Sequence, residues 1–163
     1  MIEKTVAATV QDLMVDRGYT LAIAESCTGG MLCSSIADNP GSSAYFDRGY
    51  ICYSYRSKTE MLQISAALIE EKGAVSIEVA EAMAISARKL SKTDFGLAVT
   101  GIAGPDGGTR EKPVGTVAFA LATPQAVFSK MLILPKLGRM PIRKNAVAIA
   151  LDMLRHHLLS EVA

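Results

Sequence analysis

Short apolar runs alternate along this chain with segments whose apolar residues recur at helical spacing, and this alternation limits the possible folds more than any other feature. Residues 2–17 and 77–91 show the helical spacing. Residues 20–24 and 96–100 are short apolar runs of the kind that forms buried strands. Strands that alternate with helices predict an α/β fold, in which helices cover both faces of a sheet.

Two further strand-like segments lie close together near the C-terminus. Residues 114–122 and 126–134 flank the turn sequence Thr123-Pro124-Gln125 and predict a β-hairpin. Because a hairpin pairs its strands in opposite directions, we expect a mixed sheet. The remaining expected elements are a helix over 28–37, a strand over 45–53, a helix that opens at the capping box Ser57-Lys58-Thr59-Glu60, a helical stretch over 66–72 that Gly73 stops, a helix N-cap at Ser76, and a last helix over 142–159 after Pro141.

The composition suits a single folded domain over residues 1–163, since half of the residues are hydrophobic and 20% are charged. Lys and Arg number 17, Asp and Glu number 16, and Trp is absent, so the sequence lacks the basic face and the stacking platform of nucleic-acid-binding proteins. No apolar run approaches the ~20 residues of a membrane helix, and the N-terminus has no apolar block of the signal-peptide type. We therefore expect a cytoplasmic protein with no nucleic-acid partner and no membrane partner.

Cysteine and histidine are too few, and unsuitably spaced, for several common kinds of site. The three cysteines, Cys27, Cys33 and Cys52, are an odd number without a C-x-x-C pair, which argues against a disulfide framework and fits a reducing compartment. The two histidines, His156 and His157, are adjacent near the C-terminus. We therefore expect no metal site, and a Ser-His-Asp triad would have almost no histidine to use.

The segment Ala24-Glu25-Ser26-Cys27-Thr28-Gly29-Gly30 runs from the end of an expected strand into the start of an expected helix. Ligand sites of open α/β sheets lie at the carboxyl ends of strands, and free N–H groups at a helix start can hold an oxyanion or a phosphate. A serine on such a turn, Ser26, is well placed to act as a nucleophile. The same residues also fit a turn in which Ser26 or Thr28 merely caps the helix, and spacing alone favours that interpretation.

A serine hydroxyl needs a base to remove its proton, and Lys58 is the candidate base in a chain so poor in histidine. Lysine can serve only as the neutral amine, so its pKa must be lowered from the usual value of about 10.4. In the first turn of a helix, Lys58 would lie near the positive end of the helix dipole, which disfavours the ammonium form. The alternative is an ordinary solvated lysine, and the segment taken alone favours it.

Glycines gather in the segment Thr100-Gly-Ile-Ala-Gly-Pro-Asp-Gly-Gly-Thr109, directly after an expected strand. They suggest a backbone cradle for an anionic or planar ligand, although the segment matches neither a Walker loop nor G-x-G-x-x-G. A mobile surface loop would explain the same glycines. Near the start of the last helix, Arg139 and Arg143 belong to a run of cations that could hold a phosphate or could form a solvated basic edge.

Together these segments resemble the CinA C-terminal domain family, the nicotinamide-mononucleotide deamidases. The resemblance covers nearly the whole chain, in the stretches AESCTGG (24–30), AYFDRGYICYS through Lys58 (44–58), GAVSIEVAEAMA (73–84) and TGIAGPDGGTREKPVGTV (100–117). It implies a three-layer α/β/α fold with a mixed, mostly parallel sheet of about five strands that includes the C-terminal hairpin. It also implies a homo-oligomer that binds a small pyridine mononucleotide and needs no cofactor and no metal.

The activity that the resemblance implies is hydrolysis of the carboxamide of nicotinamide mononucleotide, which gives nicotinate mononucleotide and ammonia. The family's serine, lysine and tyrosine correspond to Ser26, Lys58 and Tyr53, which would act as nucleophile, general base and proton relay. Binding of the substrate and its oxyanion would fall to the turn after the serine, the glycine segment and the helix-start arginines, namely Cys27, Thr28, Gly29, Gly30, Gly101, Gly104, Gly107, Gly108, Thr109, Arg139 and Arg143.

Two other functions are compatible with the sequence. A nucleotide-binding module would use the same glycine loops and break no bond, because a fold does not fix a function. A metal-dependent nucleotide hydrolase would need clustered carboxylates, and Glu25 and Asp106 are the only acids in the candidate loops. Ammonia release separates an amidase from the binding module, and full activity in excess chelator would eliminate the metal-dependent hydrolase.

Overall fold

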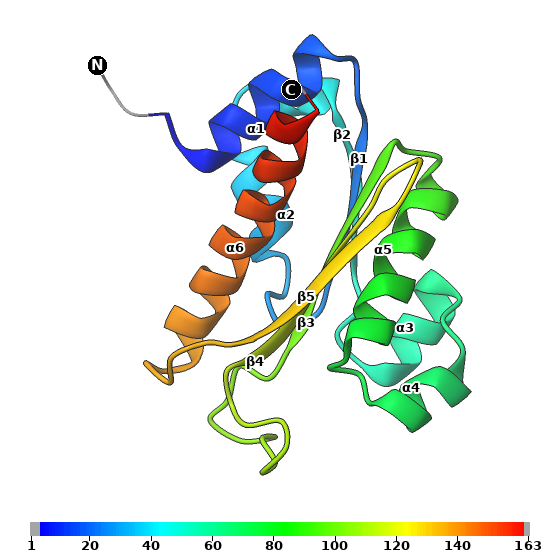
Figure 1. The fold of residues 1–163 in the computed structure, drawn as a ribbon, viewed down its shortest axis with the longest axis vertical. Helices are drawn as coiled ribbons and strands as arrows, with labels where there is room; N and C mark the ends of the chain where they lie inside the picture. Colours follow the sequence, from blue (N-terminus) through cyan, green and yellow to red (C-terminus); the bar gives the residue numbers. More distant parts are fainter. Residues whose placement is uncertain (1–3, 162–163) are drawn as a thin grey trace.

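The computed structural model describes residues 4–161 and contains a five-stranded sheet between two layers of helices (Figure 1). In chain order the elements are α1 (Val6–Asp16), β1 (Leu21–Glu25), α2 (Met31–Ala37), a short 3₁₀ helix (Ser42–Ala44), β2 (Phe46–Ile51), α3 (Tyr55–Leu62), α4 (Ala66–Lys72), α5 (Ile77–Ser91), β3 (Phe95–Gly101), β4 (Thr116–Ala122), β5 (Val127–Ile133) and α6 (Arg139–Ser160). Apart from the 3₁₀ helix, each element overlaps a segment for which the sequence predicts it. Residues 2 and 3 of the first predicted helix lie outside the described residues.

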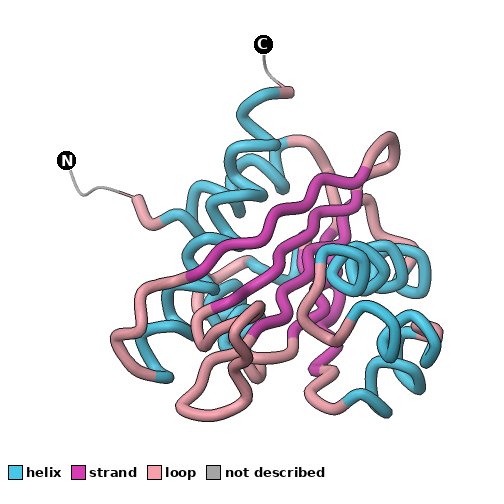
Figure 2. Tube along the Cα trace, turned by 60° about the horizontal axis from the view of Figure 1, so that its bottom comes forward, coloured by secondary structure: helices cyan, strands magenta, loops and turns pink. Residues whose placement is uncertain are grey.

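The sheet has the strand order β2-β1-β3-β4-β5, and Figure 2 shows these strands side by side between the helices. β1 pairs in parallel with β2 and β3, whereas β4 is antiparallel to both of its neighbours. Four strands therefore share one direction, which confirms the predicted α/β fold with a mixed, mostly parallel sheet and a C-terminal hairpin. Helices α1, α2 and α6 cover one face, and α3, α4 and α5 cover the other (Figure 1).

The two faces of the sheet carry side chains of different size, and this difference sets how closely the helices approach. Toward α1 and α6 the strands present large residues such as Leu97 and Phe119. Toward α5 they present mostly alanine, Ala98 among them. The backbones approach closely at Gly96, where an added Cβ would lie 2.1 Å from the carbonyl oxygen of Ala84. Small residues on this face therefore fix the position of α5 against the sheet.

Helix α3 begins earlier than the sequence pattern predicts. Its N-cap is Ser54, whose Oγ accepts the N–H of Ser57 at 3.0 Å, while the Oγ of Ser57 accepts the N–H of Ser54 at 3.0 Å. The predicted capping box that opens at Ser57 is therefore wrong, because a hydroxyl three residues upstream forms the reciprocal pair first. The earlier start places Lys58 at the fourth position of the helix.

Helix α6 likewise begins earlier than predicted, at Arg139 instead of after Pro141. Pro141 is the third residue of the helix, where proline is tolerated because the N–H groups of the first turn have no acceptor within the helix. As a consequence, Arg139 and Arg143 lie about one turn apart on the same helix.

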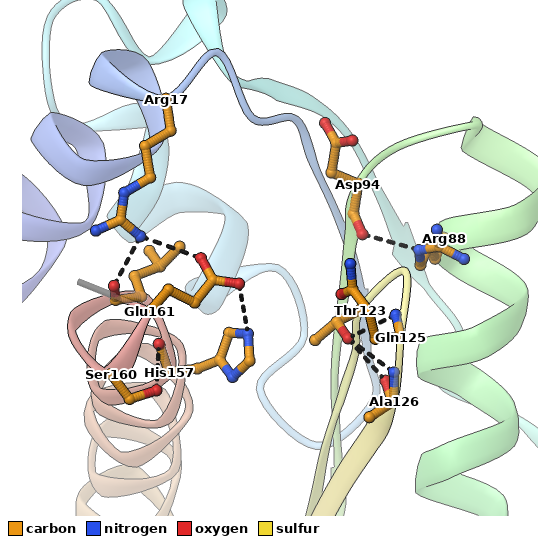
Figure 3. A network of polar contacts seen from close by, with 10 residues as sticks. Arg17, Arg88, Asp94, Thr123, Gln125, Ala126, His157, Ser160 and Glu161 are labelled. Carbon is orange, nitrogen blue, oxygen red and sulfur yellow. Dashed lines mark hydrogen bonds and ion pairs between the residues drawn. The ribbon is translucent and has the colours of Figure 1, made fainter. Parts of the chain in front are cut away.

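From that first turn, α6 runs to the far end of the molecule, where it is tied to α1 (Figure 3). Arg17, directly after α1, donates through Nη1 to the carbonyl of Leu158 at 2.7 Å and to the carboxylate of Glu161 at 3.1 Å. On the other side of the sheet, Arg88 of α5 donates to the carbonyl of Asp94 at 2.8 Å (Figure 3). Hydrogen bonds thus hold both helical layers near the amino ends of β1 and β3. The carboxyl ends of these strands lie together at the opposite end of the sheet, which is called the carboxyl edge below.

Candidate active site

Ser26 directly follows β1 at the carboxyl end of the strand, and its N–H donates to the carbonyl of Val99 at 3.0 Å. The chain then turns through Gly29 and Gly30, whose φ angles of 58° and 98° lie in the left-handed region that glycine adopts without strain. Helix α2 begins at the next residue. Ser26 is only 7% exposed and lines a cavity at this edge of the sheet, so its hydroxyl opens into that cavity.

Lys58 reaches the same cavity from α3. Its Nζ lies 2.9 Å from Ser26 Oγ and 2.8 Å from the carbonyl oxygen of Cys52, to which it donates. The pairing of β1 with β2 brings these groups together, because Glu25 is opposite Ile51 and the N–H of Cys52 donates to the carbonyl of Glu25 at 2.8 Å. The residues that follow the two strands therefore lie side by side, and α3 carries the lysine back over them.

The surroundings of Lys58 favour the neutral amine. Lys58 is 1% exposed, and within residues 4–161 it takes part in no ion pair with a carboxylate. Burial lowers the pKa of Lys58 from its ordinary value of 10.5, because the ammonium form loses its hydration. The position near the start of α3 acts in the same direction, since the helix dipole disfavours a cation there. The alternative of an ordinary solvated lysine is therefore wrong for this chain.

A neutral Lys58 is oriented to accept the proton of Ser26. One N–H of the amine is directed to the carbonyl of Cys52 at 2.8 Å. The lone pair can then accept the hydroxyl hydrogen of Ser26 across the 2.9 Å that separates Nζ from Oγ. The arrangement offers a candidate nucleophile, a candidate base and a third group that orients the base, which is a combination that can activate a serine.

The carboxylate of Glu25 is fully buried and caps α2. It accepts the N–H groups of Leu32 at 3.1 Å and Cys33 at 3.0 Å, together with the hydroxyl of Thr28. A carboxylate at the positive end of a helix is favourable, which accounts for a buried acid that forms no ion pair within residues 4–161. These helix-start N–H groups are therefore occupied by the protein itself, and the turn before the helix has to supply any donors for an oxyanion. The sequence pattern does not predict this role of Glu25, although a charged side chain at the end of a buried strand needs hydrogen-bonding partners.

Arg143 of α6 binds the turn of residues 26–30, which carries the candidate nucleophile and is called the nucleophile turn below. Its Nε donates to the carbonyl of Cys27 at 3.0 Å, and its Nη2 donates to the carbonyl of Thr28 at 2.7 Å. The same nitrogen lies against Gly29, where an added Cβ would be 3.2 Å away from it. The guanidinium of Arg143 thus faces backbone carbonyls behind the serine.

Tyr53 and Arg139 lie together in the cavity wall. Arg139 donates through Nη2 to the hydroxyl of Tyr53 at 2.6 Å and through Nη1 to the carbonyl of Gly104 at 2.8 Å. Tyr53 is 56% exposed, and in the part of the chain that the structure describes its hydroxyl makes no hydrogen bond to Ser26 or Lys58. The start of α6, the residues after β2 and the glycine segment therefore meet at one point.

The Ser26–Lys58 pair opens into a cavity of about 260 Å³. Of the site residues predicted from the sequence, this cavity brings together Ser26, Tyr53, Lys58, Gly101, Gly104, Gly107 and Arg139. Gly108 and Thr109 line a neighbouring cavity of about 310 Å³, which shares Asp106 and Gly107 with the first and is bordered by Lys136. The other predicted residues are in the nucleophile turn or contact it, and they are Cys27, Thr28, Gly29, Gly30 and Arg143.

Close packing holds the glycine segment at two positions. A Cβ on Gly101 would lie 2.8 Å from Cγ2 of Val117 and 3.1 Å from Sγ of Cys27, so a larger residue would press on the nucleophile turn. Gly104 has a φ of 75°, and a Cβ there would lie 2.6 Å from Cγ1 of Val114. These contacts suit the interpretation as a ligand cradle better than that of a free surface loop.

Several residues that line the cavity were not predicted as site residues, and they are Tyr55, Ala74, Val75, Thr100, Ile102, Ala103 and Asp106. Thr100 ties two walls of the cavity together, because its hydroxyl donates to the carbonyl of Ala74 at 2.9 Å. The sequence contains patterns from which Thr100 and Ala74 could have been predicted as site residues. Thr100 opens the glycine segment, and Ala74 lies in the stretch 73–84 that resembles the family.

The thiol of Cys27, next to the serine, does not compete as a nucleophile. Burial raises the pKa of Cys27 to about 11, so the reactive thiolate is scarce at neutral pH. All three cysteines are free thiols. Within residues 4–161, no group of three or more His, Cys, Asp or Glu side chains is placed to hold a metal ion, and no helix there is both long and apolar enough to cross a membrane.

A serine hydroxyl beside a buried lysine, at the carboxyl ends of the parallel strands of a three-layer fold, defines a candidate hydrolase site. The family comparison then assigns this chain. The CinA C-terminal domain model matches residues 3–158, so the chain belongs to the CinA C-terminal domain family. It is 50% identical over 157 residues to a protein of Shewanella oneidensis named nicotinamide-nucleotide amidohydrolase PncC, covering 96% of this chain and 37% of that protein. A CinA-like protein of Shewanella denitrificans shows the same identity and coverage, so the chain spans 37% of the length of these relatives.

Solved structures of related proteins share the fold. The CinA superfamily protein of Klebsiella pneumoniae matches with a TM-score of 0.91 at 28% identity, over 95% of this chain and 96% of that one. The competence/damage inducible protein of Agrobacterium tumefaciens matches with a TM-score of 0.88 at 35% identity, over 94% of this chain and 96% of that one. The arrangement of strands and helices that surrounds the site is therefore a property of the family.

Proposed function

We propose that this chain is an amidohydrolase that converts nicotinamide mononucleotide to nicotinate mononucleotide and ammonia, with Ser26 as nucleophile and Lys58 as general base. The observation that carries the proposal is the 2.9 Å separation between Ser26 Oγ and the Nζ of a buried lysine. The name of the Shewanella oneidensis relative, nicotinamide-nucleotide amidohydrolase, supports the choice of substrate.

The proposed reaction consists of two half-reactions. In the first, neutral Lys58 takes the hydroxyl proton while Ser26 Oγ attacks the carboxamide carbon, and the lysine then returns the proton to the nitrogen that leaves as ammonia. In the second, Lys58 takes a proton from water and the resulting hydroxide attacks the acyl-serine ester. Lys58 returns that proton to Ser26 Oγ as the ester bond breaks, and the released acid loses its own proton to solvent to give the carboxylate. Ser26 and Lys58 end in their starting forms, and one water is consumed for each ammonia released.

Stabilisation of the oxyanion falls to the turn that follows the serine. Glu25 already occupies the N–H groups at the start of α2. The N–H groups of Cys27 and Thr28 are therefore the donors that we assign to the developing negative charge. One such donor contributes roughly 3–4 kcal/mol to the stabilisation of the transition state.

The outer part of the cavity suits the nucleotide portion of the substrate. A guanidinium can pair with phosphate through two parallel hydrogen bonds, and Arg139 is the arginine that lines the cavity. The glycine segment would enclose the ribose and the pyridine ring. In this proposal the proton passes from Lys58 to the leaving nitrogen directly or through the hydroxyl of Tyr53. That hydroxyl accepts from Arg139 and keeps its own hydrogen free to donate.

Ammonia release from a set of pyridine nucleotides tests the proposal. The wild-type protein should release ammonia from nicotinamide mononucleotide. Ser26→Ala should lower kcat about 10³-fold or more, and Lys58→Ala should lower it about 10²–10⁴-fold. Ser129→Ala and Lys144→Ala remove the same groups at positions away from the cavity and should keep the wild-type rate. If Ser26→Ala or Lys58→Ala keeps nearly wild-type kcat, that residue has no place in the mechanism.

A binding measurement distinguishes the amidase from a nucleotide-binding module. Wild-type protein that binds the mononucleotide but releases no ammonia would favour the binding module. Rapid quenching followed by mass spectrometry adds a direct test of the first half-reaction. An acyl group on Ser26 is expected in the wild-type protein and should be absent from the Ser26→Ala variant.

A further inference from the structure

Two arginines lie about one turn apart on α6 and have different kinds of partner. Arg139 lines the cavity and donates to the hydroxyl of Tyr53 at 2.6 Å. Arg143 contacts the nucleophile turn instead, through the carbonyls of Cys27 at 3.0 Å and Thr28 at 2.7 Å. The sequence predicts the same phosphate-binding role for both arginines, whereas these contacts separate them.

Peptide geometry connects the contacts of Arg143 to the orientation of the donors in the turn. In a trans peptide the N–H points opposite to the C=O of the same unit. Because the carbonyl of Cys27 is held by Arg143, the N–H of Thr28 points away from α6. The carbonyl of Thr28 is also held by Arg143, and the N–H of Gly29 in that unit donates to the carbonyl of Ser26 at 3.0 Å.

The nucleophile turn needs such restraint. Gly29 and Gly30 have positive φ and little steric resistance to rotation of the neighbouring peptide units. Glu25 holds the turn by accepting the hydroxyl of Thr28, and it holds the start of α2 by accepting the N–H groups of Leu32 and Cys33. Arg143 holds the middle of the turn by its carbonyl oxygens, so two charged groups restrain the turn.

We propose that Arg143 is a positioning residue for the reaction and is not a ligand of the substrate. It fixes the two peptide units that follow the serine, so that Ser26 Oγ stays within reach of Lys58 and the N–H of Thr28 keeps the orientation needed for an oxyanion. This role rests on the proposed function. The planar fork of an arginine suits it, because two donors must meet two consecutive carbonyls at once.

Steady-state ammonia release tests this role with three variants. Arg143→Ala should lower kcat about 10²-fold while KM changes by less than about threefold, because a misplaced nucleophile impairs catalysis without weakening binding. Arg143→Lys should recover part of the lost kcat, since a single nitrogen cannot reproduce both contacts in the same geometry. Lys144→Ala removes a positive charge from the adjacent exposed position and should change neither constant.

Hydrogen–deuterium exchange over residues 25–33 gives a readout that needs no substrate. Exchange should accelerate in Arg143→Ala at Gly29, whose N–H is bonded within the turn, and should be unchanged in Lys144→Ala. The positioning role would be overturned if Arg143→Ala exchanges at the wild-type rate in this segment. It would also be overturned if the kinetic defect of Arg143→Ala is confined to a raised KM. If the wild-type protein releases no ammonia from any pyridine nucleotide, the proposed function fails, while the exchange result still decides whether Arg143 holds the turn.

Discussion

Replacing Lys58 by methionine removes the proposed base while nearly keeping the shape of the side chain. Methionine is unbranched, apolar and adaptable, so it suits a position that is 1% exposed. The change removes the contacts of Nζ with Ser26 Oγ at 2.9 Å and with the carbonyl of Cys52 at 2.8 Å. Ser26 then has no base, and kcat for ammonia release should fall by about 10²–10⁴-fold, the usual contribution of a general base.

The same substitution should change how the free energy of unfolding depends on pH. Burial lowers the pKa of Lys58 in the folded state below the ordinary value of 10.5, which applies in the unfolded chain. At a pH between the folded-state pKa and 10.5, the unfolded chain therefore binds more protons than the folded one. The stability of the wild-type protein therefore rises with pH across this window, and below it the full cost of burying an ammonium is present. Methionine has no such cost, but it leaves the carbonyl of Cys52 without a donor, which costs about 1–3 kcal/mol. The free energy of unfolding of Lys58→Met, relative to that of the wild type, should therefore be highest at low pH and lowest near pH 10.5.

Two measurements check this reasoning. In the wild-type protein, kcat/KM for ammonia release should rise with pH and level off below pH 10.5, while the profile of Lys58→Met stays low and flat. Urea denaturation of both proteins at neutral and at alkaline pH gives the difference in stability. A wild-type profile that rises only around pH 10.5, or a difference in stability that is the same at every pH, would refute the argument for a neutral buried amine.

Three other substitutions test the packing and the charges of the site. Gly101→Ala should destabilise the fold by about 1–3 kcal/mol in urea, because the new Cβ would lie 2.8 Å from the side chain of Val117; an unchanged midpoint would contradict this contact. Glu25→Gln should destabilise the protein by about 1–3 kcal/mol, since an amide cannot accept all the hydrogen bonds of the buried carboxylate, while the exposed control Glu70→Gln should stay within about 0.5 kcal/mol of the wild type. Arg139→Ala should raise KM for the mononucleotide about tenfold or more with little change in kcat, as expected for loss of a charge-assisted contact, and steady-state kinetics that show the loss in kcat alone would exclude phosphate binding.

The parts of the fold that could be predicted are those with local causes. Ser76 caps α5 as predicted, because its Oγ accepts the N–H of Val79 at 3.2 Å and the apolar stripe begins at once. The start of α3 was misplaced because Ser54 and Ser57 are both hydroxyls that can cap a helix, and sequence spacing does not rank them. The start of α6 was misplaced because Pro141 is equally acceptable before a helix and within its first turn.

Individual residues of the site could be predicted, whereas their contacts could not. Ser26 and Lys58 are 32 residues apart in sequence, and the 2.9 Å between them depends on which residues of β1 and β2 pair. A shift of that pairing by one residue would turn every side chain of β2 to the other face of the sheet. The bonds from Arg143 to the nucleophile turn span 115 and 116 residues, so no local pattern carries them.

The antiparallel strand β4 explains why these distant segments meet at one edge of the sheet. β3 ends where Gly101 pairs with Val117 of β4, so the connection that holds the glycine segment leaves and returns at the edge that carries Ser26. β5 then runs back beside β4 and ends at Ile133, opposite Thr116, so α6 must also begin at this edge. A helical crossover after β3 would instead have carried the chain to the opposite edge before the next strand. The hairpin thus brings both arginines of α6, Arg139 and Arg143, to the site. Their different positions, Arg139 in the cavity and Arg143 against the turn behind the serine, depend on three-dimensional contacts that no local pattern encodes.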